Sequence, residues 1–443
     1  MPVDVDKIQS SEKFPTKVDV AIIGGGIVGA CAAYEMALKG LSVALLEKGH
    51  IGGEQSSRNW GWVRQQNRDL FELPMAMYSL DRWEALGPEL GVDLGFRRSG
   101  IVFTTTQDED MQRWERWNNR AREQGFVSHL MTSAQARERS PGSTTSWVGG
   151  VWSPTDGRAE PAKAAPAIAD GARKLGAYVV QQCAVRGLEI VAGRAAGVWT
   201  ERGLIKADSV VCAGGAWSSR LCRRHGIDLP IANIVGTAMR TTPVPEFVGG
   251  GVSTPNLSLR RRLDGCYTLA IPGFGRMELA PQGIRYAARF YQVYRAKLAK
   301  KLKIRIGSSF FNGPEAAGSW EMDQASPFER IRVLDPAPDR ELLGAALANL
   351  IKEFPAFQGV QVAQSWAGLI DTTPDIVPVI STVDALPGFI IAAGMSGHGF
   401  GIGPGAGRLI CEMVMNEKPY LNIDAYRLTR FSDGTQLRKP EMM

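Results

Sequence analysis

The stretch VDVAIIGGGIVGACAAYEMALKGLSVALLE, residues 18–47, decides the fold of this chain. Its first six residues are mostly apolar and predict a buried strand, and the glycine cluster after them opens a helix that we expect over residues 27–39. Residues 42–47 form a second apolar run of strand length. The stretch therefore predicts a strand–helix–strand unit with two parallel strands.

The glycines of this stretch form a G-x-G-x-x-G pattern at Gly24, Gly26 and Gly29. The first allows a tight turn, the second lets the backbone approach a pyrophosphate, and the third lets the helix pack close to the sheet. The N-terminus of the helix would then face the phosphates. Glu47 ends the second strand, where a carboxylate can accept hydrogen bonds from ribose hydroxyls. This context predicts a dinucleotide site, but it does not separate FAD from NAD.

Segments of nucleotide-binding type also lie in the middle and near the end of the chain. A helix is expected over residues 159–175, short strands over 177–212, a buried strand at 389–393 and a helix near 404–415. The last of the short strands, residues 209–212, is apolar enough to rejoin the first sheet. We predict an α/β fold with a discontinuous Rossmann-like cofactor domain (residues 17–95, 155–235 and 360–435), a mixed β-sheet substrate domain (96–154 and 236–359) and a loosely held N-terminal tail (1–16).

Further elements are expected between these segments. They are predicted from hydrophobic periodicity and turn residues. The predicted elements are helices at 70–90 and 108–125, strands at 101–106, 266–271 and 284–290, and a basic helix at 291–303.

Composition excludes several classes of function. The chain has 443 residues, a net charge of +6 and no clustered basic tract, so we expect no nucleic-acid partner. The densest basic stretch, residues 295–303, is interpreted as a solvated helix face, with a membrane-surface contact less favoured. Six scattered cysteines form no CxxC pair, so we expect neither a zinc site nor a redox dithiol. We see no leader and no apolar run of bilayer length, which favours a cytoplasmic protein with reduced thiols.

Three further segments carry a resemblance to a known family. They are GGEQSSRNWG (residues 52–61), VVCAGGAWS (210–218), and WAG (366–368) followed by TPDIVP (373–378) and GMSGHGFG (394–401). In this order they resemble the motifs of the D-amino-acid-oxidase-like superfamily of flavoproteins, which includes glycine and sarcosine oxidases and bacterial amino-acid dehydrogenases. The resemblance spans nearly the whole chain and implies that the cofactor domain binds FAD.

The resemblance implies a position for each motif around FAD. Residues 56–58 would lie by the pyrophosphate and ribityl chain, and residues 59–61 beside the isoalloxazine ring. Val185 would bind adenine through its backbone, and residues 213–214 would let the sheet pass close to FAD. The residues that we expect to bind the cofactor are Gly24, Gly26, Ile27, Val28, Gly29, Glu47, Lys48, Ser56, Ser57, Arg58, Asn59, Trp60, Val185, Ala213, Gly214, Trp217, Gly368, Gly394, His398, Gly399, Phe400, Gly401 and Ile402.

The C-terminal glycines have a physical reason to face the flavin. Reduced flavin gains negative charge at N1 and at the C2 carbonyl, and residues 399–402 precede a helix expected to start near Pro404. Backbone N–H groups and a positive dipole end there would stabilise that charge. Relatives of the sarcosine-oxidase type attach flavin through a cysteine near this loop. No cysteine lies between Cys266 and Cys411, so we expect noncovalent FAD.

Substrate recognition departs from the resemblance. Many family members that act on amino acids carry an arginine two residues after the glycine of the WxG motif, whereas this chain has Ile370, which cannot pair with a carboxylate. Asp371 follows it and could bind an ammonium or guanidinium, although a loop aspartate that bonds its own backbone is the competing interpretation. The candidates to hold a substrate carboxylate are Arg64, Arg98, Arg285 and Arg289.

No catalytic acid or base is assigned. His398 is expected to orient backbone, and Trp60 and Trp62 could wall an aromatic slot or simply pack in the core. The pocket candidates are Trp60, Trp62, Arg64, Tyr267, Tyr286, Asp371 and His398.

These expectations combine into one function. We predict FAD-dependent oxidative deamination of an amino acid, with Asp371 tilting the prediction toward a basic one such as arginine or lysine. A hydride would pass from the α-carbon to flavin N5, and the imine would hydrolyse to the keto acid. Oxygen or an electron carrier would accept the electrons, and a homo-oligomer is compatible with the sequence.

Several alternatives stay open. One is oxidation of a secondary amine, an N-methyl amino acid or a polyamine, and another is an FAD-binding subunit of a larger dehydrogenase complex. A flavin hydroxylase is disfavoured because its second ribityl motif is missing, and a dithiol flavin reductase because no CxxC pair is present. An NAD dehydrogenase with two Rossmann halves is disfavoured because it would not explain residues 56–58 or the C-terminal motifs.

Overall fold

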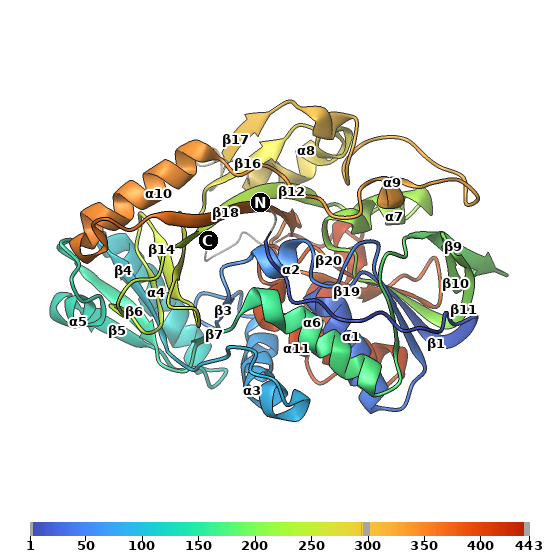
Figure 1. Cartoon of the computed structure of the whole chain (residues 1–443), viewed down its shortest axis with the longest axis horizontal. Helices are drawn as coiled ribbons and strands as arrows, with labels where there is room; N and C mark the ends of the chain where they lie inside the picture. Colours follow the sequence, from blue (N-terminus) through green and yellow to red (C-terminus); the bar gives the residue numbers. More distant parts are fainter. Residues whose placement is uncertain (1–2, 294, 296–301, 438–443) are drawn as a thin grey trace.

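Two β-sheets organise the chain (Figure 1). The computed structural model describes residues 3–293, 295 and 302–437. The strands of the first sheet are β1 (Lys17–Ile23), β2 (Val43–Leu46), β8 (Tyr178–Val180), β9 (Val185–Val191), β10 (Arg194–Thr200), β11 (Gly203–Cys212), β19 (Val379–Thr382) and β20 (Phe389–Ala393). Their order is β19–β20–β11–β1–β2–β8, with β10 pairing β11 and β9 pairing β10.

The centre of the first sheet is parallel and buried on both faces. Strand β1 pairs in parallel with β2 and with β11, and β11 pairs in parallel with β20. Val20 and Ile22 of β1 pack into one apolar cluster, whereas Ala21 packs into another on the opposite face. This explains why the deciding stretch is nearly continuous in apolar residues rather than alternating.

Helices cover one face of this sheet. They are α1 (Ile27–Leu38), α3 (Leu73–Leu90), α6 (Pro161–Lys174) and α11 (Gly399–Val414). Helix α1 contacts both α6 and α11, and α11 contacts α3, so segments from the start, middle and end of the chain lie side by side (Figure 1). The short helices α2 (Gln55–Arg58) and α7 (Ser218–Arg224) lie next to the strand ends.

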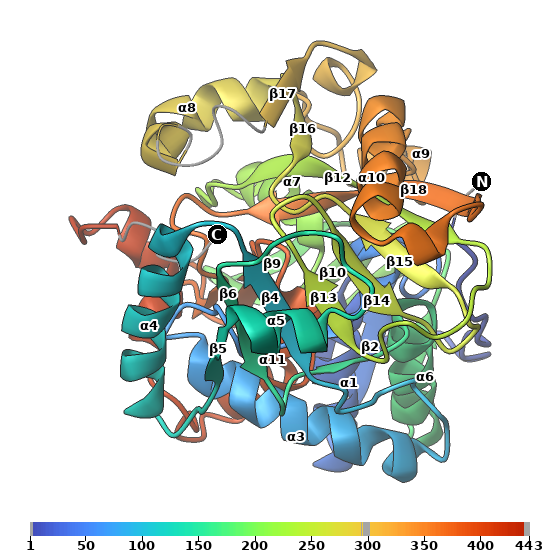
Figure 2. The same cartoon turned by 90° about the vertical axis from the view of Figure 1, so that its left-hand side faces the viewer.

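The second sheet is mixed and has ten strands among the described residues. They are β4 (Ile101–Thr105), β5 (His129–Thr132), β6 (Gly149–Ser153), β12 (Ala232–Thr241), β13 (Gly251–Ser253), β14 (Ser258–Arg261), β15 (Tyr267–Ala270), β16 (Gly275–Glu278), β17 (Leu302–Arg305) and β18 (Val362–Thr372). Helix α10 (Arg340–Glu353) packs over β12 and β15 on one face (Figure 2). The opposite face meets the cofactor layer through α2 and a short ladder of β3 (Trp62–Val63) with β7 (Gly157–Arg158).

Three of the remaining helices lie on the second layer: α4 (Asp108–Arg122), α5 (Ser133–Arg139) and α8 (Pro281–Val293). Helix α9 (Pro327–Arg330) lies on the first sheet, where Phe328 joins an apolar cluster and Glu329 pairs with Arg186 of β9. No helix of the described residues is long and apolar enough to cross a membrane.

The α/β fold with a parallel cofactor sheet and a mixed second sheet is confirmed, but one predicted element is wrong. Residues 284–290, predicted as a strand, lie in α8, where Tyr286 and Val293 turn inward at helical spacing and Ile284 is exposed. Their alternation of apolar and basic residues imitates a strand, but Pro281 starts a helix. The helix expected at 291–303 lies largely outside the described residues, and its end, Leu302–Arg305, is strand β17.

The predicted domain boundaries stay a proposal, which the strand pairing modifies at three points. The strand β18, placed in the cofactor domain by its WAG motif, pairs along its length with β12 in the second sheet. Strand β12 itself begins at Ala232, before the boundary predicted after residue 235. The tail is also less loose than expected, because Ser11 exchanges hydrogen bonds with Val179 of β8.

Candidate functional site

A large cavity lies at the ends of the parallel strands of the first sheet. It encloses about 1230 Å³ of empty space, part of it open to solvent. Five separate stretches line it: residues 23–28, 46–59, 212–221, 369–371 and 392–400, joined by Val185 and Phe328. Ligands of open α/β sheets bind at the carboxyl ends of the strands, which is where this cavity lies.

The glycine turn at the end of β1 is tightly packed in two of its three positions. Gly24 has φ +107°, and a Cβ there would lie 2.5 Å from the carbonyl oxygen of Ala213. A Cβ on Gly29 would overlap the carbonyl oxygen of Gly24. At Gly26 a Cβ would meet only Ser56 Oγ, at 3.1 Å. Gly24 and Gly29 therefore serve packing, and Gly26 keeps the mouth of the helix open for a ligand.

Glu47 holds the two loops on either side of β2. Its Oε2 accepts a hydrogen bond of 2.8 Å from Gly25 N, and its Oε1 accepts one of 2.7 Å from Gly49 N. Burial raises the pKa of this carboxyl above its ordinary value. Each carboxylate oxygen has a second lone pair, so Glu47 can still accept a ribose hydroxyl at the cavity wall.

A polar cluster that the sequence did not reveal closes one end of the cavity. The Lys48 ammonium donates to Glu54 Oε1 at 2.6 Å and lies 4.6 Å from the centre of the Trp217 ring. Trp217 Nε1 donates to Glu54 Oε2 at 3.1 Å, and Leu334 N donates to the same carboxylate. Glu54 lies two residues before Ser56, but nothing in the sequence pairs it with Trp217.

The Ser-Ser-Arg segment divides between the cavity and the protein interior. Ser56 Oγ accepts a hydrogen bond of 2.8 Å from Ile27 N at the start of α1. Arg58, expected to lie beside the cofactor, does not line the cavity. Its guanidinium pairs with Asp335 Oδ1 at 2.7 Å and donates to the carbonyl of Ala367. Arg58 thus ties α2 to β18 rather than facing a phosphate.

Two orphan polar atoms show that the cavity is built for a polar ligand. Gln55 Oε1 and Ser218 Oγ are buried, line the cavity and have no hydrogen-bond partner among the described residues. Buried polar groups are rarely left unpaired in a native protein. Together with the open helix mouth at Gly26, they fit a dinucleotide such as FAD.

The loop before α11 is held by Asp371. Its Oδ2 accepts hydrogen bonds from Gly394 N at 2.6 Å and Met395 N at 3.2 Å. Burial raises the pKa of Asp371 to about 6. Oδ2 of Asp371 is therefore engaged by the backbone, as in the competing interpretation, while Asp371 also lines the cavity. Its role as a ligand for a basic substrate stays a prediction.

His398 caps the same loop. It is the N-cap residue of α11, and its Nδ1 lies 2.8 Å from Glu72 Oε2. Burial and the nearby Arg68 guanidinium lower the pKa of His398 to about 4, so the ring is neutral near pH 7. Helix α11 begins at Gly399, earlier than the predicted start near Pro404. Gly399 and Phe400, both at its first turn, line the cavity.

The predicted aromatic residues lie between the two sheets. Trp60 and Trp62 make an edge contact at 5.7 Å, and Trp62 makes another with Phe103 of β4 at 5.8 Å. Trp60 packs against an apolar cluster on the second sheet that contains Trp366. Neither tryptophan lines the cavity, although their neighbour Asn59 does.

Two predicted tyrosines lie away from the cavity. Tyr267 is fully buried under α10, and its hydroxyl donates to the carbonyl of Val248. Tyr286 lies on α8 and donates to Asp228 Oδ1 at 2.8 Å. The alternative arginines also have other roles: Arg98 pairs with Asp81 and Glu84, Arg289 pairs with Asp228, and Arg285 lies over Tyr286.

Arg64 differs from these arginines. It follows β3, half-buried, and has no ion-pair partner among the described residues, although its Nη1 donates to the carbonyl of Gln66. Burial and the adjacent Arg68 lower the pKa of Arg64 to about 9. Strand β3 lies against the start of α11, since a Cβ on Gly401 would be 3.5 Å from Trp62 O. Arg64 thus makes no direct ion pair among the described residues, although the carboxylates of Asp156 and Glu72 act on its charge from further away.

Most of the predicted cofactor residues are brought together by the fold. Those that line the cavity are Gly24, Gly26, Ile27, Val28, Glu47, Lys48, Ser56, Asn59, Val185, Ala213, Gly214, Trp217, Gly399 and Phe400. Those that lie outside its lining are Gly29, Ser57, Arg58, Trp60, Gly368, Gly394, His398, Gly401 and Ile402. Among the described residues, no cluster of histidine, cysteine and carboxylate side chains could hold a metal ion.

Comparison with known proteins agrees with this site. A family model described as FAD dependent oxidoreductase (DAO) matches residues 19–413. Sarcosine oxidase subunit beta of Arthrobacter sp is 26% identical over 94% of this chain and 91% of its own length. Glycine oxidase of Geobacillus kaustophilus is 25% identical over 94% of this chain and 97% of its own length. Other relatives are longer, and the chain spans 47% and 42% of two of them.

A solved structure shares the architecture described above. The L-amino acid deaminase from Proteus myxofaciens, solved in complex with anthranilate, superimposes with a TM-score of 0.92. It is 29% identical in sequence, and the match covers 97% of each chain.

Proposed function

The chain belongs to the FAD-dependent oxidoreductase family, an enzyme family with FAD as its cofactor, and from that premise we propose that it oxidises the carbon–nitrogen bond of an amino acid. The relatives named above include an amino acid deaminase, a glycine oxidase and a sarcosine oxidase subunit. Their names share a small amine that carries a carboxylate. A site for such a substrate needs a cation close to the flavin end of the cavity.

Arg64 is the observation that carries this proposal. The Arg64 guanidinium makes no direct ion pair among the described residues, and burial together with the neighbouring Arg68 outweighs the attraction of the Asp156 and Glu72 carboxylates, so its charge is unfavourable without a ligand. A bound carboxylate would supply the missing charge with paired hydrogen bonds. We therefore assign the carboxylate to Arg64, which takes the role that Ile370 cannot fill. Because Asp371 is engaged by backbone N–H groups, the proposal includes no preference for a basic side chain.

The chain's own residues would hold FAD along the cavity. The turn at residues 24–28 would face the pyrophosphate, Glu47 the ribose and Val185 the adenine, while Gly399 and Phe400 would face the flavin. All six cysteines are buried thiols, so we propose that FAD is held without a covalent bond. Bound FAD supplies the capacity to accept a hydride from the carbon next to the nitrogen.

The residues around the substrate would orient it and exclude water. Arg64 would fix the carboxylate, and Trp60, Trp62 and Phe103 would cover the space between the sheets. A neutral amine needs no dedicated base for this reaction, which agrees with a neutral, bonded His398. The imine product then hydrolyses in water. Oxygen or an electron carrier accepts the electrons, and an oxygen-uptake assay separates these two.

Anaerobic bleaching of the flavin tests the proposal. The purified yellow protein is mixed without oxygen with a panel of L- and D-amino acids, N-methyl amino acids and polyamines. We expect bleaching by at least one substrate that carries a carboxylate. Arg64→Met should raise KM for it roughly a hundredfold, whereas Arg98→Met, at an exposed ion pair, should leave KM unchanged. Bleaching by polyamines alone, or equal behaviour of both variants, would reject the proposal.

A further inference from the structure

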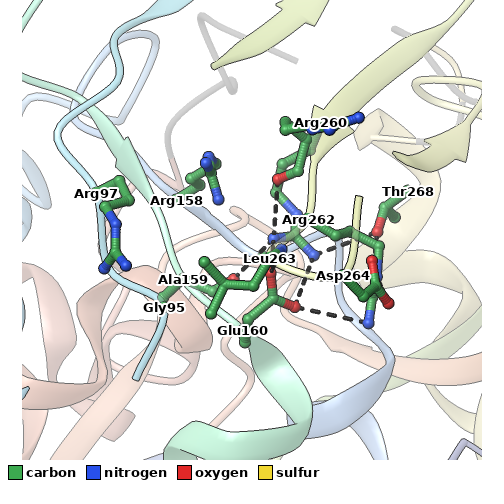
Figure 3. Close-up of polar contacts among 12 residues, drawn as sticks. Gly95, Arg97, Arg158, Ala159, Glu160, Arg260, Arg262, Leu263, Asp264 and Thr268 are labelled. Atoms are coloured by element: carbon green, nitrogen blue, oxygen red, sulfur yellow. Dashed lines mark hydrogen bonds and ion pairs between the residues drawn. The ribbon is translucent and has the colours of Figure 1, made fainter. Parts of the chain in front are cut away.

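The segment from Trp60 to Trp62 rests on a buried ion pair that lies outside the cavity. Arg260 of β14 is 1% exposed and Glu160, the N-cap residue of α6, is 5% exposed. Arg260 Nη1 lies 3.0 Å from Glu160 Oε1, and Nη2 lies 3.5 Å from Oε2. Figure 3 shows this carboxylate at the centre of contacts that reach Arg260, Arg262 and Leu263. The pair joins a helix of the cofactor layer to a strand of the second sheet.

Gly61 lies directly on the Arg260 guanidinium. A Cβ on Gly61 would be 2.7 Å from both Cζ and Nε of Arg260 and 2.6 Å from the carbonyl oxygen of Ala159. The same carbonyl of Ala159 accepts a hydrogen bond of 3.1 Å from Arg260 Nη1. Arg260 Nε has no hydrogen-bond partner among the described residues. The backbone at Gly61 thus packs against the Arg260 guanidinium, which Glu160 holds in place.

The rest of the segment is fixed by the same unit. Ala159 N donates 2.9 Å to the carbonyl of Gly61, and β3 pairs with β7 just before Glu160. On either side of Gly61, Trp60 packs on the second sheet and Trp62 contacts Phe103. Gly61 is therefore the single residue between the ion pair and the rings of Trp60 and Trp62, which lie between the two sheets.

We infer that Arg260, held by Glu160, is a positioning residue that sets the Trp60–Trp62 wall of the substrate space. This inference rests on the proposed function for its effect on turnover. The Nη1 and Nη2 atoms of Arg260 donate hydrogen bonds to Glu160, Ala159 and Thr268. Its Nε and Cζ atoms lie next to Gly61. A lysine ammonium keeps the charge, but it cannot make these hydrogen bonds and also pack against Gly61. Neither Arg260 nor Glu160 lines the cavity that residues 24–28 border, so FAD affinity should not depend on this pair.

The test compares Arg260→Lys with Arg262→Lys in the FAD-loaded protein. Arg262 belongs to the same cluster, 3.6 Å from Glu160 Oε2, but does not contact Gly61. Hydrogen–deuterium exchange of a peptide that covers residues 59–63 is the first measurement. We expect exchange at least tenfold faster in Arg260→Lys, no more than twofold faster in Arg262→Lys, and no change in a peptide that covers residues 24–29. Equal exchange in the two variants overturns the inference.

Steady-state kinetics is the second measurement, made with whichever amino acid bleaches the wild-type flavin. Arg260→Lys should raise KM about tenfold and change kcat less than threefold, with FAD affinity unchanged. Glu160→Gln, which keeps one acceptor for the guanidinium, should raise KM about threefold. A loss of FAD affinity at unchanged KM would show a general structural role and overturn the inference. If no amine bleaches the wild type, the proposed function fails, and the exchange measurement still decides whether Arg260 fixes the segment.

Discussion

At the scale of single residues, burial decides which polar side chains are available to a ligand. Asp371 resembled a substrate ligand, but two backbone N–H groups occupy it. Arg58 resembled a phosphate ligand, but it pairs with Asp335 and a carbonyl. A buried polar group must find partners, and the nearest ones are usually protein atoms. Among the residues that line the cavity, Gln55 and Ser218 each keep a buried side-chain oxygen without a hydrogen-bond partner in the described part of the chain.

Asp371 gives a prediction about pH. Its folded pKa of about 6 lies above the ordinary 3.8, so ionisation destabilises the folded state, and the loss grows from pH 4 to pH 6 and is complete above that. Asp371→Asn removes this loss, so the free energy of unfolding of the variant relative to wild type should rise by about 2 kcal/mol from pH 4 to pH 7. Urea unfolding at several pH values measures the difference, and a constant difference would contradict the prediction.

Substitutions at two glycines of the G-x-G-x-x-G pattern should have different effects. Gly24→Ala forces a side chain into a left-handed conformation 2.5 Å from Ala213 O, so the apoprotein should lose about 2 kcal/mol or more of stability. Gly26→Ala meets only Ser56 Oγ, so the apoprotein should stay within about 1 kcal/mol of wild type while FAD affinity falls at least tenfold. Thermal unfolding without FAD and a flavin titration separate the two effects. Equal losses in both assays would show that Gly26 also serves packing.

At the scale of elements, the cavity depends on how closely a short helix lies on a strand. Gly368 of β18 lets α2 pack closely on the strand, because a Cβ there would overlap Gln55 Oε1 and lie 3.1 Å from Arg58 Cβ. Trp366 Nε1 also donates 2.9 Å to the carbonyl of Arg58. The WxG motif is therefore an element contact rather than a cofactor contact, although it positions Gln55 and Ser56 at the cavity wall.

Gly368→Ala should push α2 away from β18. We expect a loss of about 1–3 kcal/mol in the free energy of unfolding together with weaker FAD binding, because α2 carries two lining residues. Gly344→Ala is the matched control, since Gly344 lies exposed on α10 with nothing near its missing Cβ. The control should gain up to about 1 kcal/mol. Denaturant unfolding and flavin titration of both variants test this, and normal FAD affinity in Gly368→Ala would count against it.

At the scale of the whole molecule, the cavity exists only because five distant stretches of chain meet. The first sheet brings the ends of β1, β2 and β11 together, and α11 returns from the far end of the sequence to close it. The second sheet contributes Leu369 and Asp371 from β18. A ligand in this cavity therefore links both layers, and its binding free energy adds to the stability of the entire fold.

Removal of FAD should lower the stability of both layers together. At a free FAD concentration a hundred times Kd, the linkage amounts to about 2.7 kcal/mol. We expect a higher Tm for the FAD-loaded protein, increasing with FAD concentration, and a single transition by tryptophan fluorescence and by circular dichroism. An unchanged Tm across the titration would show that the folded protein does not bind FAD in this cavity.

The sequence by itself determined the parts that depend on local geometry. Only glycine fits the turn at Gly24, and apolar strands with a helix between them form one parallel unit, so residues 18–47 specify the β1–α1–β2 unit at the centre of the first sheet. The ordered motifs then specified the family. The tertiary structure decided what depends on contacts between distant side chains: the binding of Asp371 to a loop, the Arg58–Asp335 pair and the Glu54–Trp217 contact. Those partners are separated by tens to hundreds of residues, and hydrogen bonding in the interior is settled only when the chain is packed.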